Sequence, residues 1–229
     1  MTGFSTKQAQ ALSYKSDARR GLLVVFMAGV LWSTFGLGIR MIDEATVWQI
    51  LLYRSISLSL FLAIVIYLRS SENLFTVVRA AGLPACLAGL ALVGAYAGGI
   101  YGIQSTSVAN AMLLFASAPF MAAILGWIFL REKVRKATWI SILFAMLGIG
   151  IMVQDKSTGS ALLGNLAALG SAFGFAVFTV ALRWGRSGEM LPAVFLSGIF
   201  AIFITSSICL LSGLSFQISV NDTSISMGM

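Results

Sequence analysis

Residues 47–67 read VWQILLYRSISLSLFLAIVIY, an apolar stretch of about twenty residues that is long enough to cross a bilayer as a helix. Arg54 lies inside it, and a charge within such a stretch usually marks a binding site or a transport path. Six further stretches of this kind occupy residues 21–39, 80–103, 108–130, 139–153, 162–182 and 193–214. The sequence therefore predicts an all-α polytopic membrane protein with seven transmembrane helices.

The composition and the charge distribution support the same architecture and orient it. Hydrophobic residues make up 59% of the chain and charged residues 10%, with a mean hydropathy of +0.94. Most of the Lys and Arg residues fall on one side of the predicted membrane, namely Lys7, Lys15, Arg19, Arg20, Arg69, Arg79, Arg131, Lys133, Arg135, Lys136, Arg183 and Arg186. Because basic loops stay inside, we expect a cell-membrane protein (inner membrane in a bacterium) with a cytoplasmic N-terminus. No aromatic–basic patch lies outside the membrane, so no nucleic-acid partner is expected.

The residues that most enzymes and metal sites use are scarce. The chain has no histidine, and its acidic residues lie in predicted loops or at the ends of spans. Histidine is both the commonest metal ligand and the commonest general base. We therefore expect no catalytic residue, no metal, no cofactor and no enzymatic activity. An integral membrane enzyme acting on lipid-linked substrates and a non-transporting membrane scaffold are the alternatives to a transporter.

The chain also contains an internal repeat. Displacing the sequence by 143 residues aligns Gly21 with Gly164, Leu23 with Leu166, Phe35 with Phe178, Arg40 with Arg183, Ile56 with Ile199 and Leu68 with Leu211. Five predicted spans separate the copies, so the second copy enters the membrane from the opposite side, as in many secondary transporters. We expect a cytoplasmic segment at 1–20, a complete five-helix repeat at 21–153 and a partial second repeat at 162–229.

The fourth and fifth spans carry the most recognisable pattern. The run TSVANA at 106–111 opens the fourth span, Pro119 interrupts it, LRE at 130–132 ends it, and GIGI at 148–151 closes the fifth. With Trp32-Ser33 in the first span and an arginine early in the second, this pattern resembles the EamA family of the drug/metabolite transporter superfamily.

The resemblance implies ten helices in two inverted five-helix repeats around a central cavity. It also implies alternating-access transport, often export, of small polar metabolites such as amino acids. Seven of the ten expected helices are present, so we expect a fragment of a ten-span protein, with a complete seven-span protein as the alternative. The expected partners are a small-molecule substrate, not identified, and membrane lipid; homo-oligomerisation is left open.

Polar and small residues on three spans are the candidates for lining that cavity. In the first span a small, polar stripe indicates either a cavity wall or tight helix packing. In the second, Arg54 lies roughly 10 Å from the outer end at 1.5 Å per residue. We expect it to pair with a carboxylate or phosphate, unless it snorkels to the headgroups. The predicted cavity-lining set is Trp32, Ser33, Gly36, Gln49, Tyr53, Arg54, Ser57, Asn110, Ser117 and Pro119.

Pro119 has a further consequence, because proline removes one helical hydrogen bond and leaves the carbonyl of Phe115 free. The fourth span is therefore expected to be kinked, either as a movable element beside the substrate or as a static bend. Glu132 at the cytoplasmic end of this span and Arg40 are predicted to be gate or structural residues. Glu132 is expected to pair with a basic residue.

Overall fold

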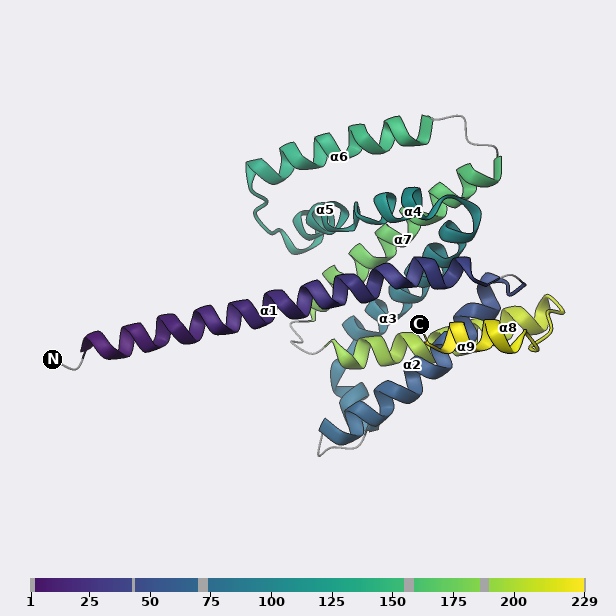
Figure 1. Ribbon diagram of the computed structural model, residues 1–229, viewed down its shortest axis with the longest axis horizontal. Helices are drawn as coiled ribbons and strands as arrows, with labels where there is room; N and C mark the ends of the chain where they lie inside the picture. The colour runs from purple at the N-terminus through teal and green to yellow at the C-terminus, as the bar shows by residue number, and fades with distance from the viewer. Residues whose placement is uncertain (1–2, 43, 70–73, 155–158, 186–189, 229) are drawn as a thin grey trace.

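The computed structural model describes residues 3–42, 44–69, 74–154, 159–185 and 190–228, and within these ranges it is helical (Figure 1). The helices are α1 (Gly3–Arg40), α2 (Val47–Arg69), α3 (Leu74–Ser105), α4 (Val108–Phe115), α5 (Ala118–Leu130), α6 (Lys136–Gln154), α7 (Gly159–Trp184), α8 (Leu191–Leu211) and α9 (Val220–Gly228).

The helices correspond closely to the predicted membrane spans. Six segments of the described chain are long and apolar enough to cross a membrane: Gly21–Arg40, Val47–Arg69, Gly82–Ser105, Val108–Leu130, Ala161–Trp184 and Leu191–Leu211. The predicted fifth span coincides with the shorter apolar helix Lys136–Ile151. An all-α polytopic membrane fold is thus confirmed, and the protein is a multi-pass membrane protein.

The fourth span is divided into two helices. α4 ends at Phe115 and α5 begins at Ala118, because Pro119 occupies the first turn of α5, where its missing N–H is not needed. Ser117, at the break, donates its hydroxyl hydrogen to the carbonyl oxygen of Leu114 at 2.6 Å. The expected bend is therefore present as a break at Ala116 and Ser117, near the middle of the span, where both residues keep right-handed helical dihedrals.

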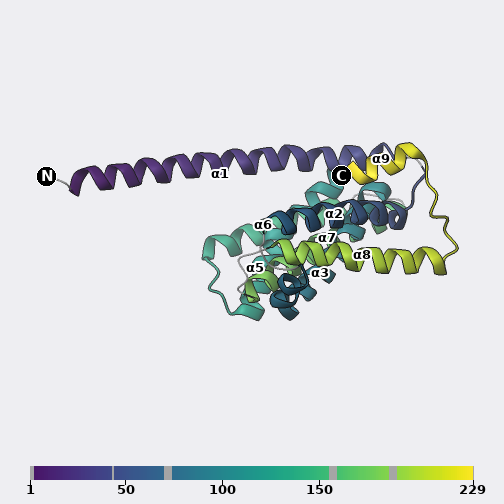
Figure 2. The ribbon, with the colours of Figure 1, turned by 90° about the horizontal axis from the view of Figure 1, so that it is seen from below.

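The centre of the bundle is formed by α3, which packs against α7 and α8 through small residues. A Cβ atom added to Gly98 would lie 2.7 Å from the carbonyl oxygen of Ala167, and one added to Gly102 would lie 3.1 Å from the Cβ of Ala168. Such distances require the two backbones to approach closely, as small residues permit in membrane helices. The peripheral helices differ: α1 extends away from the bundle at its N-terminal end (Figures 1 and 2).

The polar segment after α8 contains a short helix, α9. This helix lies beside α2 and places Asp222 against the start of α2. The Asp222 carboxylate, 2% exposed, accepts hydrogen bonds from the backbone N–H groups of Glu44 at 3.3 Å and Ala45 at 3.2 Å. An anion at this position also suits the positive end of the α2 dipole.

Candidate functional site

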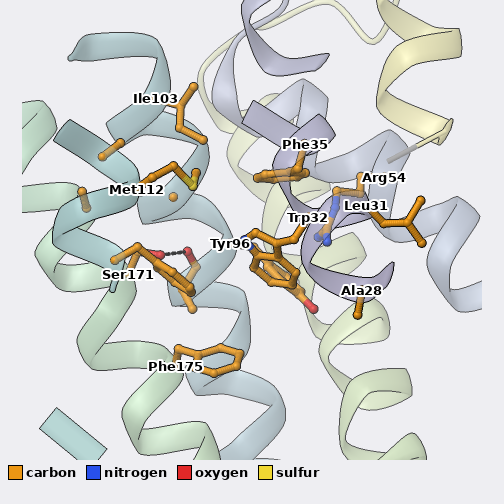
Figure 3. Close-up of a pocket in the computed structure, with 15 residues that line it drawn as sticks. Ala28, Leu31, Trp32, Phe35, Arg54, Tyr96, Ile103, Met112, Ser171 and Phe175 are labelled. Atoms are coloured by element: carbon orange, nitrogen blue, oxygen red, sulfur yellow. Dashed lines mark hydrogen bonds between the residues drawn. The ribbon is translucent and has the colours of Figure 1, made fainter. Parts of the chain in front are cut away.

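A cavity of about 290 Å³ lies between helices α1, α2, α3, α4 and α7 (Figure 3). Its walls are aromatic, aliphatic or small, apart from the side chains of Arg54, Tyr96 and Ser171. The lining residues are Ala28, Leu31, Trp32, Phe35, Arg54, Ala95, Tyr96, Gly99, Ile103, Ala111, Met112, Phe115, Ala168, Ser171 and Phe175.

Arg54 supplies the charge of this cavity. Its side chain is 8% exposed, and its guanidinium carbon lies 4.0 Å from the ring centroid of Tyr96 and 5.4 Å from that of Phe35. Figure 3 shows both rings beside the guanidinium group. The two rings stabilise the cation through their π faces, which does not occupy its N–H donors.

Two of the three guanidinium nitrogen atoms of Arg54 are buried without hydrogen-bond partners among the described residues. Within the described residues, its buried Nε and Nη1 atoms have no hydrogen-bond acceptor. A buried donor without an acceptor costs about 1–3 kcal/mol, and more when the group is charged. Arg54 is thus a buried, unpartnered cation in a cavity wall, an arrangement that favours binding of an anionic group.

Five aromatic rings form a continuous series, of which Trp32, Phe35, Phe115 and Phe175 line the cavity. Trp32 lies 6.2 Å from Phe35 and 6.0 Å from Phe115, measured between ring centroids. Phe115 in turn lies 5.6 Å from Phe175, which lies 5.6 Å from Phe178. These separations are typical of favourable aromatic pairs. Because Phe115 is the last residue of α4, the series passes through the interruption of the fourth span.

Of the residues predicted to line the cavity, Trp32 and Arg54 do so. Three others on α2 instead hold the segment that follows α8. Gln49 donates from Nε2 to the carbonyl oxygen of Ser215 at 2.6 Å, Tyr53 donates from its hydroxyl to that of Phe216 at 2.6 Å, and Ser57 to that of Met227 at 2.8 Å. The polar face of α2 therefore serves two purposes, with Arg54 directed to the cavity and its neighbours to the chain beyond α8.

The remaining predicted residues lie outside the cavity lining. Ser33 is exposed, and Gly36 is buried against α4, where an added Cβ would lie 2.8 Å from the Cγ1 atom of Val108. Asn110 lies in the first turn of α4, and its backbone N–H donates to the capping hydroxyl of Ser107 at 3.1 Å. Ser117 and Pro119 form the break between α4 and α5.

The two residues predicted as gate or structural contacts are both engaged in contacts between helix ends. Glu132 forms an ion pair with Arg183, with 2.7 Å between Oε2 and Nη1, and Arg183 also donates to the carbonyl oxygen of Ala122 at 3.3 Å. Arg131 adopts a left-handed conformation (φ 54°) that ends α5 just before Glu132. Arg40, at the end of α1, donates to the carbonyl oxygen of Thr106.

Sequence reasoning missed most of the aromatic wall. Phe35 and Phe175 had one available signal, their alignment with Phe178 and Trp32 across the repeat. Tyr96 and Phe115 had no signal that assigns them to a cavity wall. Their place in the cavity follows from how α3, α4 and α7 pack.

A family model for EamA-like transporters matches residues 19–154, more than half of the chain and nearly all of the part that forms α1 to α6. The chain belongs to the EamA-like transporter family. No solved structure matches it significantly.

Several curated proteins are similar to this family member. The uncharacterized transporter YetK of Bacillus subtilis is 36% identical over 35% of this chain and 26% of its own length. An uncharacterized transporter of Vibrio cholerae is 26% identical over 70% of this chain and 53% of its own length. Protein RarD of Escherichia coli is 24% identical over 82% of this chain and 64% of its own length. The chain thus spans less than two thirds of the length of each of these relatives.

Proposed function

We propose that the protein is a membrane transporter that moves a small metabolite by alternating access, with the Arg54 cavity as its substrate site. The observation that carries this proposal is a cation, 8% exposed, whose Nε and Nη1 atoms lack partners in a cavity wall. Membership of a transporter family supports it further. The substrate class is the small polar metabolites, amino acids and related solutes among them, and the direction is export.

Arg54 would hold the substrate through its guanidinium N–H donors. A carboxylate can accept two parallel hydrogen bonds from a guanidinium group, and such bidentate pairs are stronger than neutral hydrogen bonds. Tyr96 and Phe35 keep the guanidinium in place without occupying these donors. The carboxylate would then neutralise the buried charge, so that binding removes a cost that the empty site carries.

Access to the cavity from the two sides would alternate as helices rearrange around it. α1 to α4 supply most of the wall and α7 the remainder, so relative movement of these groups would open one side and close the other. The break at Ala116 and Ser117 provides a hinge, because there α4 ends and α5 begins. Phe115, next to the break, would move with it.

The proposed location is the cell membrane, with the N-terminus in the cytoplasm. This orientation rests on the concentration of Lys and Arg residues in 1–20 and in the segments after the second, fourth and sixth predicted spans. Reporters fused after Arg135 and near Lys156 test it: the first should report the cytoplasm and the second the outer side. An outer-side signal after Arg135 would contradict the orientation.

The substrate site is tested by removing the charge of Arg54. Vesicles that contain the protein are loaded with a mixture of amino acids and organic acids, and efflux is followed by mass spectrometry. We expect Arg54→Gln to abolish efflux of the transported solutes, and Arg54→Lys to retain part of it, because an ammonium group does not reproduce bidentate pairing.

The matched control is Arg69→Gln, which removes an exposed arginine from the last turn of the same helix. This variant should transport at the unaltered rate. Unchanged efflux in Arg54→Gln, at equal membrane abundance, would show that Arg54 does not bind the substrate.

A further inference from the structure

We infer that the Arg54 cavity takes monocarboxylates with an aromatic or branched apolar body, and that it discriminates against zwitterionic amino acids with the same body. This inference rests on the proposed function and, among amino acids and related solutes, selects the related carboxylic acids that lack an ammonium group. It follows from three features of the cavity: one cation, apolar walls and the lack of an acceptor set for an ammonium group.

The number of charges selects a monoanion. Among the lining residues that the structure describes, Arg54 is the one charged side chain, so a bound dianion such as a phosphate monoester would keep an unbalanced charge in an apolar site. Burial of an unpaired charge is strongly unfavourable. A carboxylate carries one negative charge and matches the flat N–H edge of the guanidinium.

The apolar walls of the cavity favour a ligand whose body is also apolar. Trp32, Phe115 and Phe175 form consecutive members of the aromatic series, with centroid separations of 6.0 and 5.6 Å, and Leu31, Ile103 and Met112 complete an apolar surface. A flat ring or a branched aliphatic chain gains by leaving water for such a surface. A hydroxylated or otherwise polar body would lose hydrogen bonds to water without replacing them.

The lack of acceptors excludes a buried ammonium. The cavity wall holds no carboxylate within the described part of the chain, and the Ser171 hydroxyl already donates to the carbonyl oxygen of Ala95 at 2.6 Å. An ammonium group has three donors, and the hydroxyl oxygens of Ser171 and Tyr96 would satisfy at most two of them. An α-ammonium would also lie near the Arg54 guanidinium, because it is two bonds from the carboxylate that Arg54 holds. Repulsion between these like charges adds to the cost of desolvation.

A cation–π contact with Phe115 or Trp32 is a further compensation for an ammonium. Such contacts are weaker than the hydration that an ammonium loses on entry into an apolar site. The corresponding 2-oxo acid keeps the carboxylate and the body while avoiding this loss. The cavity should therefore prefer phenylpyruvate to phenylalanine.

The experiment measures binding to the purified protein in nanodiscs of phosphatidylethanolamine and phosphatidylglycerol. Trp32 lines the cavity, so its fluorescence reports occupancy, and Trp32→Phe identifies the contribution of this residue to the signal. The probes are phenylpyruvate, phenylacetate, phenylalanine, phenethylamine, phenyl phosphate and pyruvate. They vary the ammonium, the anion and the body one at a time.

We expect phenylpyruvate and phenylacetate to bind about tenfold or more tightly than phenylalanine and phenyl phosphate, since a site penalises groups that it leaves unpaired. Phenethylamine should not bind, and pyruvate should bind weakly because it lacks the apolar body. Arg54→Gln should abolish binding of both aromatic acids, whereas Arg69→Gln should leave it unchanged.

The outcomes separate this inference from the proposed function. Equal, Arg54-dependent binding of phenylalanine and phenylpyruvate would overturn the inference and leave Arg54 as the substrate site. Tighter binding of phenyl phosphate or pyruvate than of phenylpyruvate would overturn it as well. No Arg54-dependent binding of any probe, together with unchanged efflux in Arg54→Gln, would overturn both.

Discussion

α1 and α7 contribute side chains to the same cavity, yet they differ greatly in how they pack. Positions 143 residues apart correspond: Ala28 and Ser171, and Trp32 and Phe175, all line the cavity (Figure 3). However, 44% of the most apolar window of Ala161–Trp184 is buried, against 11% for Gly21–Arg40. Corresponding residues therefore line the cavity from α7, which is embedded in the bundle, and from α1, which lies at its edge.

Because α7 is more deeply packed than α1, we expect the two helices to behave differently when a ligand binds. α7 is held against α3 by contacts without room for an extra atom, so its cavity residues are fixed in place. α1 has few such contacts, so its residues can adjust to a ligand with less disturbance of the core. The inverted repeat over 21–153 and 162–229 stays a prediction, and the aromatic series Phe35–Trp32–Phe115–Phe175–Phe178 is the arrangement that such a repeat would produce.

The largest expected contrast is between Gly174 on α7 and Gly29 on α1. A Cβ at Gly174 would lie 2.8 Å from the carbonyl oxygen of Ala91 and 3.0 Å from the backbone nitrogen of Ala95, whereas one at Gly29 would have nothing within 4 Å. Gly174→Ala should destabilise the protein by about 3 kcal/mol, since backbone atoms cannot move aside cheaply. Gly29→Ala should stabilise it by about 0.5 kcal/mol. Unfolding in mixed micelles measures both, and similar stabilities would show that the two helices are equally constrained.

A second contrast compares the aromatic residues Phe175 and Trp32. Phe175 is half-buried, while Trp32 is 46% exposed. We expect Phe175→Ala to cost about 2 kcal/mol of stability, below the range for fully buried rings. Trp32→Ala should cost about 1 kcal/mol of stability or less, because nearly half of the Trp32 surface is already exposed and little buried apolar surface is lost. Both should weaken binding of phenylpyruvate, and a loss of binding confined to Phe175→Ala would exclude Trp32 from the site.

A third contrast concerns the arginines that end the two helices. Arg183 pairs with Glu132, with side chains 40% and 43% exposed, whereas Arg40 donates to the carbonyl oxygen of Thr106. The coupling between Glu132→Gln and Arg183→Gln should be about 0.5 kcal/mol and should shrink as salt is added, as for exposed pairs. Arg40→Gln should show no comparable salt dependence. A salt-independent coupling of several kcal/mol would instead identify a buried, rigid link between α5 and α7.

The smallest expected effect is at Ser33, which corresponds to Ala176 on α7. Ser33 is exposed, while Ala176 is 0% exposed in a cluster with Ala122 and Val180. Ser33→Ala should change stability by less than about 0.5 kcal/mol, as surface substitutions usually do. Ala176→Ser should destabilise by about 1 kcal/mol, because it buries a hydroxyl group. Thermal unfolding in the same detergent compares them, and an equal loss in both variants would contradict the exposure of this part of α1.

The sequence alone determined the membrane fold and the approximate spans, and it identified Arg54 as a charge within an apolar stretch. Hydropathy over about twenty residues is a local property, because a bilayer imposes it on each helix separately. A charge inside an apolar stretch is also visible locally, whereas the rings of Phe35 and Tyr96 that stabilise it come from other helices. The sequence also predicted that Glu132 pairs with a basic residue, although its partner is Arg183, 51 positions away, and not one of the basic residues beside it in the chain.

Only the tertiary structure decided which residues share the cavity. Gln49, Tyr53 and Ser57 lie on the same polar side of α2 as Arg54, yet they bind backbone carbonyls of residues 215–227, more than 160 positions away in the chain. Nothing local assigns Tyr96 and Phe115 to the cavity until α3 and α4 bring them together with α7. A helix determines the direction of each side chain relative to its own axis, whereas the neighbour that each side chain meets depends on how the helices pack.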